Sequence, residues 1–354
     1  MVTDSHSPSR RPTMTDVAQR AGVSLKTVSR VVNGVQTVDP EMAGRVQEAA
    51  DELGYRPNFA AAVLRSGART ATIGLLIKDL RNEFYATIAA AVADVARANG
   101  FQLITSYSGE NADDELEAVQ DLCRRRVDGL LIVPTSGDHA GLQKERDLGT
   151  PMVFLDRRPE GLDADAVVLD NFAGARAGTG MLLDEGHTRI GILIDTLRMP
   201  TMGERLNGVR QAYTDRGLSF DESLVVHNVA TPDKAAKRME TILAAEQAPT
   251  AFFCGNNRSG VGALRTLWAH GRTEPLVCFD DFHLSDLMPR PVTVIGYDNY
   301  ALGALGAELL FRRIRGEDFE SQTVVLPTRL IRRGTTTDAP HPTSPVNQPT
   351  EGIQ

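Results

Sequence analysis

The sequence has few cysteines and no long apolar run. Its three cysteines, Cys123, Cys254 and Cys278, form an odd, widely spaced set, which is atypical of a disulfide scaffold or a metal site. No stretch of 18 or more apolar residues is present, so we expect no membrane-spanning helix. The polar N-terminus also has no apolar stretch of the kind that a secretory signal contains. We therefore expect a reduced, cytoplasmic protein that does not use a membrane as a partner.

Signatures of enzyme chemistry are also missing. The pairs Gly178-Thr-Gly180 and Gly260-Val-Gly262 do not extend to GxGxxG, so a dinucleotide site is unsupported, and there is no P-loop. The seven histidines are scattered, and none has a second ligand at metal spacing. Cys254 has no local histidine that would support a nucleophile, and a small buried side chain is the simpler interpretation. We expect no enzyme activity, no metal and no cofactor.

Basic residues are scarce, and the formal net charge is −8. The deficit is uneven along the chain. Residues 1–70 contain nine Lys/Arg and seven Asp/Glu, a balance of +2, whereas the other 284 residues contain 29 and 39, a balance of −10. A mildly basic head on an acidic body permits nucleic-acid binding through the head alone. Charge by itself does not establish that binding.

The length of 354 residues predicts two or three domains. The polar, proline-containing ends at 1–12 and 335–354 predict disordered tails. Residues 13–57 predict a helical head, 58–70 a hinge helix and linker, and 71–334 an α/β body. In the body, short apolar strands alternate with helices at 84–99 and 113–126, which is typical of a parallel sheet covered on both faces. The expected strands are 72–77, 101–107, 128–133, 151–156, 224–229, 250–256 and 275–281.

The body contains a short internal sequence repeat. TIGLLI at 72–77 and RIGILI at 189–194 share an I-G-x-x-I frame, and each precedes a polar loop and a helix. This repetition predicts two lobes of roughly a hundred residues each, within the usual size of small folding units; chance similarity of two common strand sequences is the alternative. Ligands of such sheets bind outside the carboxyl ends of the strands. Two facing lobes would therefore enclose a cleft.

The head has the spacing of a helix-turn-helix. Thr13 is the expected N-cap of a first helix, and Gly22 supplies the positive φ of a tight turn. Ala18, Gly22 and Val28 match the small contact residue, turn glycine and apolar anchor of this motif, with an unrelated helical hairpin as the alternative. Ser24 caps the second helix, whose N-terminal side chains would face the major groove. A third helix follows between Pro40 and Gly54.

The strings DVAQRAGVSLKTVSRVVNG and VQEAADELGYRPN resemble the head of the LacI–GalR family of bacterial repressors, and residues 13–334 follow that family's pattern. The resemblance implies a homodimer that binds double-stranded operator DNA. Base-edge contacts are implied for Leu25, Lys26 and Arg30. Phosphate contacts are implied for Thr13, Thr27, Asn33 and Tyr55. For Thr27 and Tyr55, packing within the head is an equal alternative.

The segment NFAAAVLRSG after Pro57 resembles the family's hinge. A helix this short is marginal in water, so we expect it to order on DNA and to insert Leu64 into the minor groove as an apolar wedge. A core position for Leu64 is the alternative. Ala62 stands where the family usually has arginine or glutamine, which puts the strength of the hinge contact in doubt.

The resemblance makes residues 72–334 an effector domain related to periplasmic sugar-binding proteins. Glu83 replaces the family's usual proline, and Asn257 stands where aspartate is usual. An aromatic platform with polar groups suits a hydroxyl-rich ring such as a sugar. For Asn82, Phe84 and Arg157 the alternatives are a helix cap, core packing and a salt bridge. The motifs assign these residues to the effector: Asn82, Phe84, Tyr85, Asp156, Arg157, Arg205, Asn256 and Asp280.

The sequence therefore predicts an α/β protein with an N-terminal three-helix helix-turn-helix head and a two-lobed, periplasmic-binding-protein-like effector domain. We expect a transcriptional repressor that a small molecule, most simply a carbohydrate, controls. One alternative is a sugar-binding transport component without DNA function. Another keeps DNA binding but makes the protein an activator or a corepressor-dependent regulator.

Overall fold

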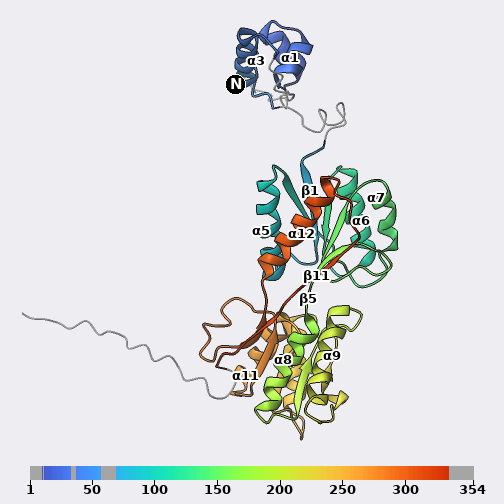
Figure 1. Ribbon diagram of the computed structural model, residues 1–354. Coiled ribbons are helices and arrows are strands. Elements are labelled where there is room, and N and C mark those ends of the chain that lie inside the picture. The colour runs from blue at the N-terminus through green and yellow to red at the C-terminus, as the bar shows by residue number, and fades with distance from the viewer. Residues whose placement is uncertain (1–9, 11, 33–36, 57–68, 335–354) are drawn as a thin grey trace, which may run out of the picture. The chain divides into compact units, whose positions relative to one another are not determined.

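The computed structural model describes residues 10, 12–32, 37–56 and 69–334. Its internal contacts divide the chain into two units, Met1–Thr70 and Ala71–Gln354, which are described separately (Figure 1). The predictions for Asn33, Ala62 and Leu64 lie outside the described residues, as do most of the expected tails and hinge. Within the described part of the chain, no helix is long and apolar enough to cross a membrane.

The first unit contains the three expected helices: α1 (Met14–Ala21), α2 (Leu25–Val32) and α3 (Pro40–Leu53). Thr13 caps α1 in a capping box with Asp16, in which each residue's side chain accepts from the other's backbone N–H. Gly22 (φ 66°) ends α1 in the left-handed conformation, as the turn of a helix-turn-helix requires. The predicted helix ends are confirmed.

Apolar side chains from all three helices form the core of this unit. Val17, Val28 and Val46 are almost completely buried, and they pack in one cluster. Arg45 on α3 adds a polar tie, because its Nη2 donates to the carbonyl of Ala21 (2.6 Å) and to that of Gly22 (3.1 Å). The third helix thus fixes the turn between α1 and α2, a role that the sequence did not reveal.

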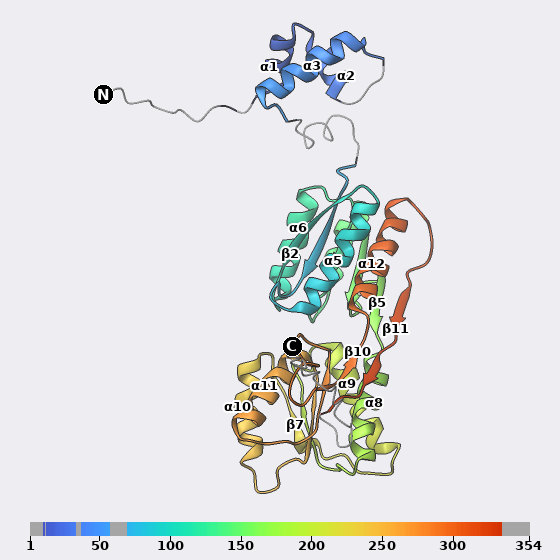
Figure 2. The same ribbon diagram turned by 90° about the vertical axis from the view of Figure 1, so that its left-hand side faces the viewer.

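The first lobe of the second unit is a six-stranded parallel sheet with strand order β11-β5-β4-β3-β1-β2. Helices α5 (Glu83–Ala98) and α12 (Asn299–Ile314) share a hydrophobic cluster with one face. Helix α6 (Ala112–Arg124) packs on the other face, as do η1 (Ala140–Leu142) and the neighbouring α7 (Gln143–Asp147) (Figures 1 and 2). The strands are β1 (Thr72–Ile77), β2 (Gln102–Tyr107), β3 (Leu130–Ile132), β4 (Met152–Asp156), β5 (Asp165–Leu169) and β11 (Thr323–Leu326).

The second lobe repeats this plan with strand order β12-β10-β9-β8-β6-β7, in which only the pairing of β12 with β10 is antiparallel among the described strands. Helices α8 (Asn171–Asp184) and α9 (Pro200–Thr214) cover one face, and α10 (Pro232–Leu243) and α11 (Asn257–Ala269) cover the other. The strands are β6 (Ile190–Leu193), β7 (Val225–Val226), β8 (Ala251–Cys254), β9 (Leu276–Phe279), β10 (Thr293–Gly296) and β12 (Arg329–Ile331).

One expected strand is wrong in extent. The prediction covered 224–229, but a 3-10 turn (η2, Glu222–Leu224) precedes a β7 of only two residues. Asn228 then adopts φ 64°, a left-handed conformation that breaks an extended strand. The apolar run therefore encodes an edge strand cut short by a turn.

The internal sequence repeat corresponds to a structural repeat. Strands β1 and β6 carry the two I-G-x-x-I segments, and each lies next to the edge strand of its sheet. The lobes are nevertheless not continuous segments, because the chain passes between them after β5, after β10 and after β11. Helix α12 and β11 thereby return to the first lobe, so three connections join the lobes (Figure 2).

Candidate functional site

Helix α2 presents a polar and basic face to solvent. Leu25 is 50% exposed, whereas Val28 is fully buried. Lys26 and Arg30 are exposed, and Arg30 Nη2 donates to Thr37 Oγ1 (3.2 Å). Because Val28 anchors one side of the helix in the core, the two cations and Leu25 project from the free side. An exposed basic helix in this motif has the form that fits a DNA major groove.

Three of the four expected phosphate-contacting residues are described, and each has contacts within the head. Thr13 Oγ1 donates to Asp16 Oδ2 (2.7 Å), which lowers the pKa of Asp16. Thr27 Oγ1 lies 2.9 Å from Ser24 Oγ, and Tyr55 packs on the head's hydrophobic cluster. Packing in the core of the head, the alternative for Thr27 and Tyr55, is thus observed for Tyr55, whereas Thr27 bonds Ser24 at the surface. The phosphate contacts of both residues remain predictions.

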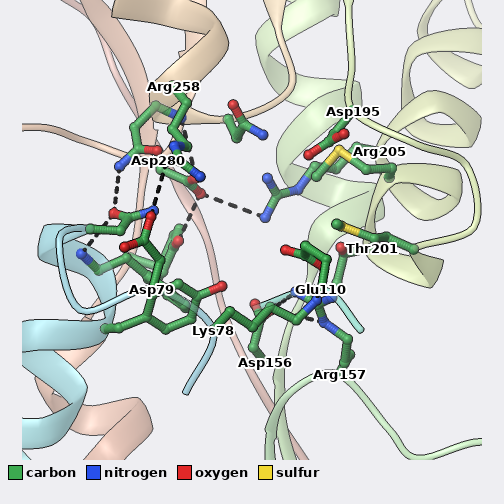
Figure 3. A pocket seen from close by; sticks show the side chains of 18 residues that line it. Lys78, Asp79, Glu110, Asp156, Arg157, Asp195, Thr201, Arg205, Arg258 and Asp280 are labelled. Atoms are coloured by element: carbon green, nitrogen blue, oxygen red, sulfur yellow. Dashed lines mark hydrogen bonds and ion pairs between the residues drawn. The ribbon is translucent and has the colours of Figure 1, made fainter. Parts of the chain in front are cut away.

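A pocket lies between the two lobes at the carboxyl ends of their strands (Figure 3). All eight residues assigned to the effector from the sequence line this one pocket. The first lobe contributes Asn82, Phe84, Tyr85, Asp156 and Arg157, and the second contributes Arg205, Asn256 and Asp280. Residues separated by up to two hundred positions in the chain are therefore brought together.

Asp156 and Asp280 are equivalent in the two lobes. Asp156 is the last residue of β4 and Asp280 directly follows β9. Each has φ 70°, a conformation that is uncommon for residues other than glycine. Asp156 pairs with Arg157 (2.6 Å), so the salt bridge weighed for Arg157 is present. Asp280 Oδ1 accepts from the hydroxyl of Tyr297 (2.7 Å), and burial is the main cause that raises the pKa of Asp280.

Arg205 is fixed on the wall of the second lobe by several contacts. Its Nε donates to Asn171 Oδ1 (2.9 Å), and its Nη2 lies 3.5 Å from Asp280 Oδ1. The guanidinium carbon also lies 3.6 Å from the ring centroid of Phe279. With 3% of its surface exposed, Arg205 offers a pre-oriented planar donor and orders the wall around it.

The expected aromatic platform is largely buried. Phe84 and Tyr85 are each 8% exposed and meet edge to face with centroids 4.9 Å apart. Both belong to the core of the first lobe, so core packing, the alternative for Phe84, is present. Only a small part of each ring faces the pocket, and stacking on a ligand remains a prediction. Burial raises the pKa of Tyr85, whose hydroxyl therefore stays protonated as a donor.

Three polar contacts join the lobes beside the pocket. Asn257 Nδ2 donates to Asn82 Oδ1 (3.1 Å), and Arg258 Nη2 lies 3.0 Å from Asp79 Oδ2. The backbone N–H of His283 donates to Glu83 Oε2 (3.1 Å). Asn82 also accepts from Phe84 N as the N-cap of α5, so the cap weighed for it is present. Glu83, which replaces the usual proline, is thus the first residue of a regular helix, and its carboxylate bonds the backbone of the other lobe.

The comparisons with known proteins match both units. Residues 13–58 match the family described as bacterial regulatory proteins, lacI family, and residues 73–283 match the periplasmic binding protein domain. Catabolite control protein A of Priestia megaterium is 30% identical over 92% of this chain and 99% of its own. The chain belongs to the lacI family of bacterial regulatory proteins.

Solved structures of other lacI-family members share this fold. A complex of the transcriptional regulator CelR with cellobiose is 32% identical, with a TM-score of 0.69 over 92% of this chain and 100% of that chain. A lac repressor dimer bound to operator and the anti-inducer ONPF is 26% identical, with a TM-score of 0.80 over 92% of this chain and 99% of that chain. The expected family and fold class are confirmed.

Sequence reasoning missed several side chains in the cleft of this lacI-family protein. Lys78 is 3% exposed and its Nζ lies 2.5 Å from Glu110 Oε2, while Asp195 is 9% exposed on the opposite lobe. The internal repeat could have found two of them, because Lys78 and Asp195 each follow the I-G-x-x-I segment directly. The other missed lining residues are Asp79, Met199, Thr201, Met202, Asn257, Arg258 and Tyr297.

Proposed function

We propose that this lacI-family protein is a homodimeric, DNA-binding transcriptional repressor controlled by a carbohydrate in the interlobe pocket. The single observation that carries the proposal is the union, in one chain, of a lacI-type head with exposed Lys26 and Arg30 and a polar cleft between two lobes. It would act in the cytoplasm, on double-stranded operator DNA, as a regulator and not as an enzyme.

The chemistry of the pocket supports a ligand rich in hydroxyl groups. Fixed donors such as Arg205 and Tyr85 line the pocket together with fixed acceptors such as Asp156 and Asp280. A sugar hydroxyl both donates and accepts, so a ring of hydroxyls can satisfy such a mixed wall. The related CelR structure contains cellobiose, which makes a carbohydrate the natural class to test first.

The cross-cleft contacts support a coupling between ligand and DNA. Asn82–Asn257 and Asp79–Arg258 form only when the lobes approach each other, and a ligand that touches both lobes would stabilise that arrangement. A related lac repressor binds operator as a dimer. If the heads of a dimer need one lobe orientation to fit an operator, ligand and DNA affinities are linked thermodynamically.

The alternative considered from the sequence, a sugar-binding transport component, does not explain the presence of a lacI-type head. The alternative and the proposal differ in DNA affinity, which selection from a pool of random duplexes on the full-length protein would measure. We expect enrichment of a near-palindromic sequence, bound with an affinity that falls steeply with salt as phosphate counterions are released. Failure to enrich any sequence at low salt would contradict the proposal.

A further inference from the structure

One carboxylate in the pocket differs from the others in its surroundings. Asp195 follows β6, is 9% exposed and lines the cleft. Its Oδ1 accepts from the neighbouring Thr196 N–H (2.8 Å), and that is its one hydrogen bond to the described residues. No lysine or arginine of the described chain lies within ion-pair distance of it. A nearly buried carboxylate in this situation has unused acceptor capacity.

The other carboxylates that line the pocket all have cationic partners. Glu110 pairs with Lys78, Asp156 with Arg157, and Asp280 with Arg205. Asp79 pairs with Arg258 across the cleft and also with Arg81. The lysine and arginines that line the pocket in the described chain, each used in one of these pairs, are Lys78, Arg157, Arg205 and Arg258. Among the pocket carboxylates of the described chain, Asp195 is therefore the one without an ion pair.

We propose that the effector carries a protonated amino group and that Asp195 binds it, so that the ligand is an amino-substituted carbohydrate. This inference rests on the proposed effector cleft. In Figure 3, Asp195 lies with Thr201 and Arg205 on the side of the second lobe, and Lys78 and Glu110 lie on the side of the first. The ammonium would be seated at Asp195, whose Oδ1 accepts only from Thr196 N–H among the described residues.

The charge of the group at Asp195 decides between an amine and a hydroxyl. Closure of the lobes removes water from Asp195, and a buried carboxylate is costly unless a cation pairs with it. An ammonium supplies that charge and three donors, whereas a hydroxyl supplies one donor and no charge. An anionic ligand such as a sugar acid or phosphate would meet Asp195 as a like charge.

The ionisation of Asp195 allows pH to distinguish the binding of an amine from the binding of a neutral sugar. Burial raises the pKa of Asp195, Glu110 on the facing lobe raises it further, and Lys78 and Lys234 lower it. An amine needs the ionised form, so its affinity should rise with pH through the titration of Asp195. A neutral sugar favoured by a protonated Asp195 would show the opposite slope.

Matched ligands test the inference on the full-length protein. D-glucosamine, D-glucose, N-acetyl-D-glucosamine and D-glucuronate, with the corresponding galacto series, would be compared by calorimetry at several pH values. We expect the amine of at least one series to bind ten or more times more tightly than its three counterparts, with an affinity that rises with pH as Asp195 ionises. Tighter binding of the neutral sugar, the amide or the acid in both series would overturn the inference, as would a lack of binding by all eight.

The variant Asp195→Asn keeps the shape and the bond from Thr196 but removes the charge. We expect it to lose most of the amine preference, measured in the variant as the ratio of the amine's affinity to the affinity of the parent sugar. An unchanged amine preference would overturn the inference, and the pH slope of the unmodified protein tests it independently if the variant does not fold. Failure of the amine with binding of a neutral sugar would leave the proposed function intact, whereas failure to select any DNA would remove that function.

Discussion

Lys78 and Asp195 occupy equivalent positions in the two lobes and carry opposite charges into one pocket. Each is the first residue after an I-G-x-x-I segment, at the carboxyl end of β1 or β6. The repeat therefore builds two similar walls and the side chains make them different, because Lys78 is neutralised by Glu110 whereas Asp195 has no such partner among the described residues. This asymmetry would give a bound ligand one preferred orientation.

Removal of the Asp195 charge should stabilise the ligand-free protein. Burial is the largest cause that raises the pKa of this carboxyl above its ordinary value of 3.8, so the folded state binds the proton more tightly than the unfolded chain does. Stability therefore falls as pH rises through the interval between the two pKa values. We predict that Asp195→Asn melts a few degrees higher than the unmodified protein at pH 7, with a difference that shrinks towards acid pH. An equal or lower melting temperature at pH 7 would contradict this.

Arg205 should be essential to the stability of the second lobe. Its truncation leaves the buried Asp280 without its cation, and loss of one partner of a buried pair costs about 3–5 kcal/mol. We predict a loss of that size for Arg205→Ala in urea-unfolding experiments. Arg210→Ala is the matched control, because Arg210 pairs with Glu222 at the surface, where such pairs contribute about 0–1 kcal/mol. Similar losses for the two variants would refute this account.

Asn82 should contribute to ligand binding beyond its role as a helix cap. Both Asn82 and Asn111 cap helices through side-chain oxygens, so Asn82→Ala and Asn111→Ala should each cost about 1 kcal/mol of stability. Only Asn82 also bonds Asn257 across the cleft. We predict that calorimetry will find weaker binding of a carbohydrate ligand for Asn82→Ala alone. Equal ligand affinities in the two variants would show that the interlobe bond has no part in closure.

The basic face of α2 should dominate DNA affinity. Lys26→Ala and Arg30→Ala each remove an exposed cation from the proposed recognition helix. We predict at least a loss of about fivefold in affinity for the selected operator, since a specific Arg or Lys contact to a base contributes about 1–3 kcal/mol. Lys237→Ala, which removes an exposed charge from α10, is the control in the same band-shift titration and should leave affinity unchanged. A loss shared by all three variants would point to net charge alone.

Much of the fold follows from local sequence signals. Thr13 and Gly22 mark the ends of α1 because capping and positive φ depend on neighbouring residues. The I-G-x-x-I repeat predicts the two sheets because a strand segment is also a local sequence pattern. The return of α12 and β11 to the first lobe could not be predicted, because it depends on contacts between segments far apart in the chain, such as α12 with α5.

Part of the pocket could also be predicted from the sequence, and part of it could not. Asp156 and Asp280 stand at strand ends inside recognisable motifs, so their place in the cleft could be predicted. Arg258 and Asp79 are ordinary charged residues in the sequence, and only the approach of the two lobes brings them within 3.0 Å. The sequence did not predict a role for Asp195. That role follows from the lack of a lysine or arginine within ion-pair distance among the described residues, which only the folded cleft shows.

The central claim is that occupancy of the cleft controls DNA binding. Its most direct test is the affinity of the full-length protein for its selected operator, measured with and without a saturating carbohydrate that calorimetry shows to bind. The account predicts a change of at least fivefold in operator affinity and, by linkage, an equal change in ligand affinity when operator is present. A ligand that binds tightly in the cleft and leaves operator affinity the same would contradict it.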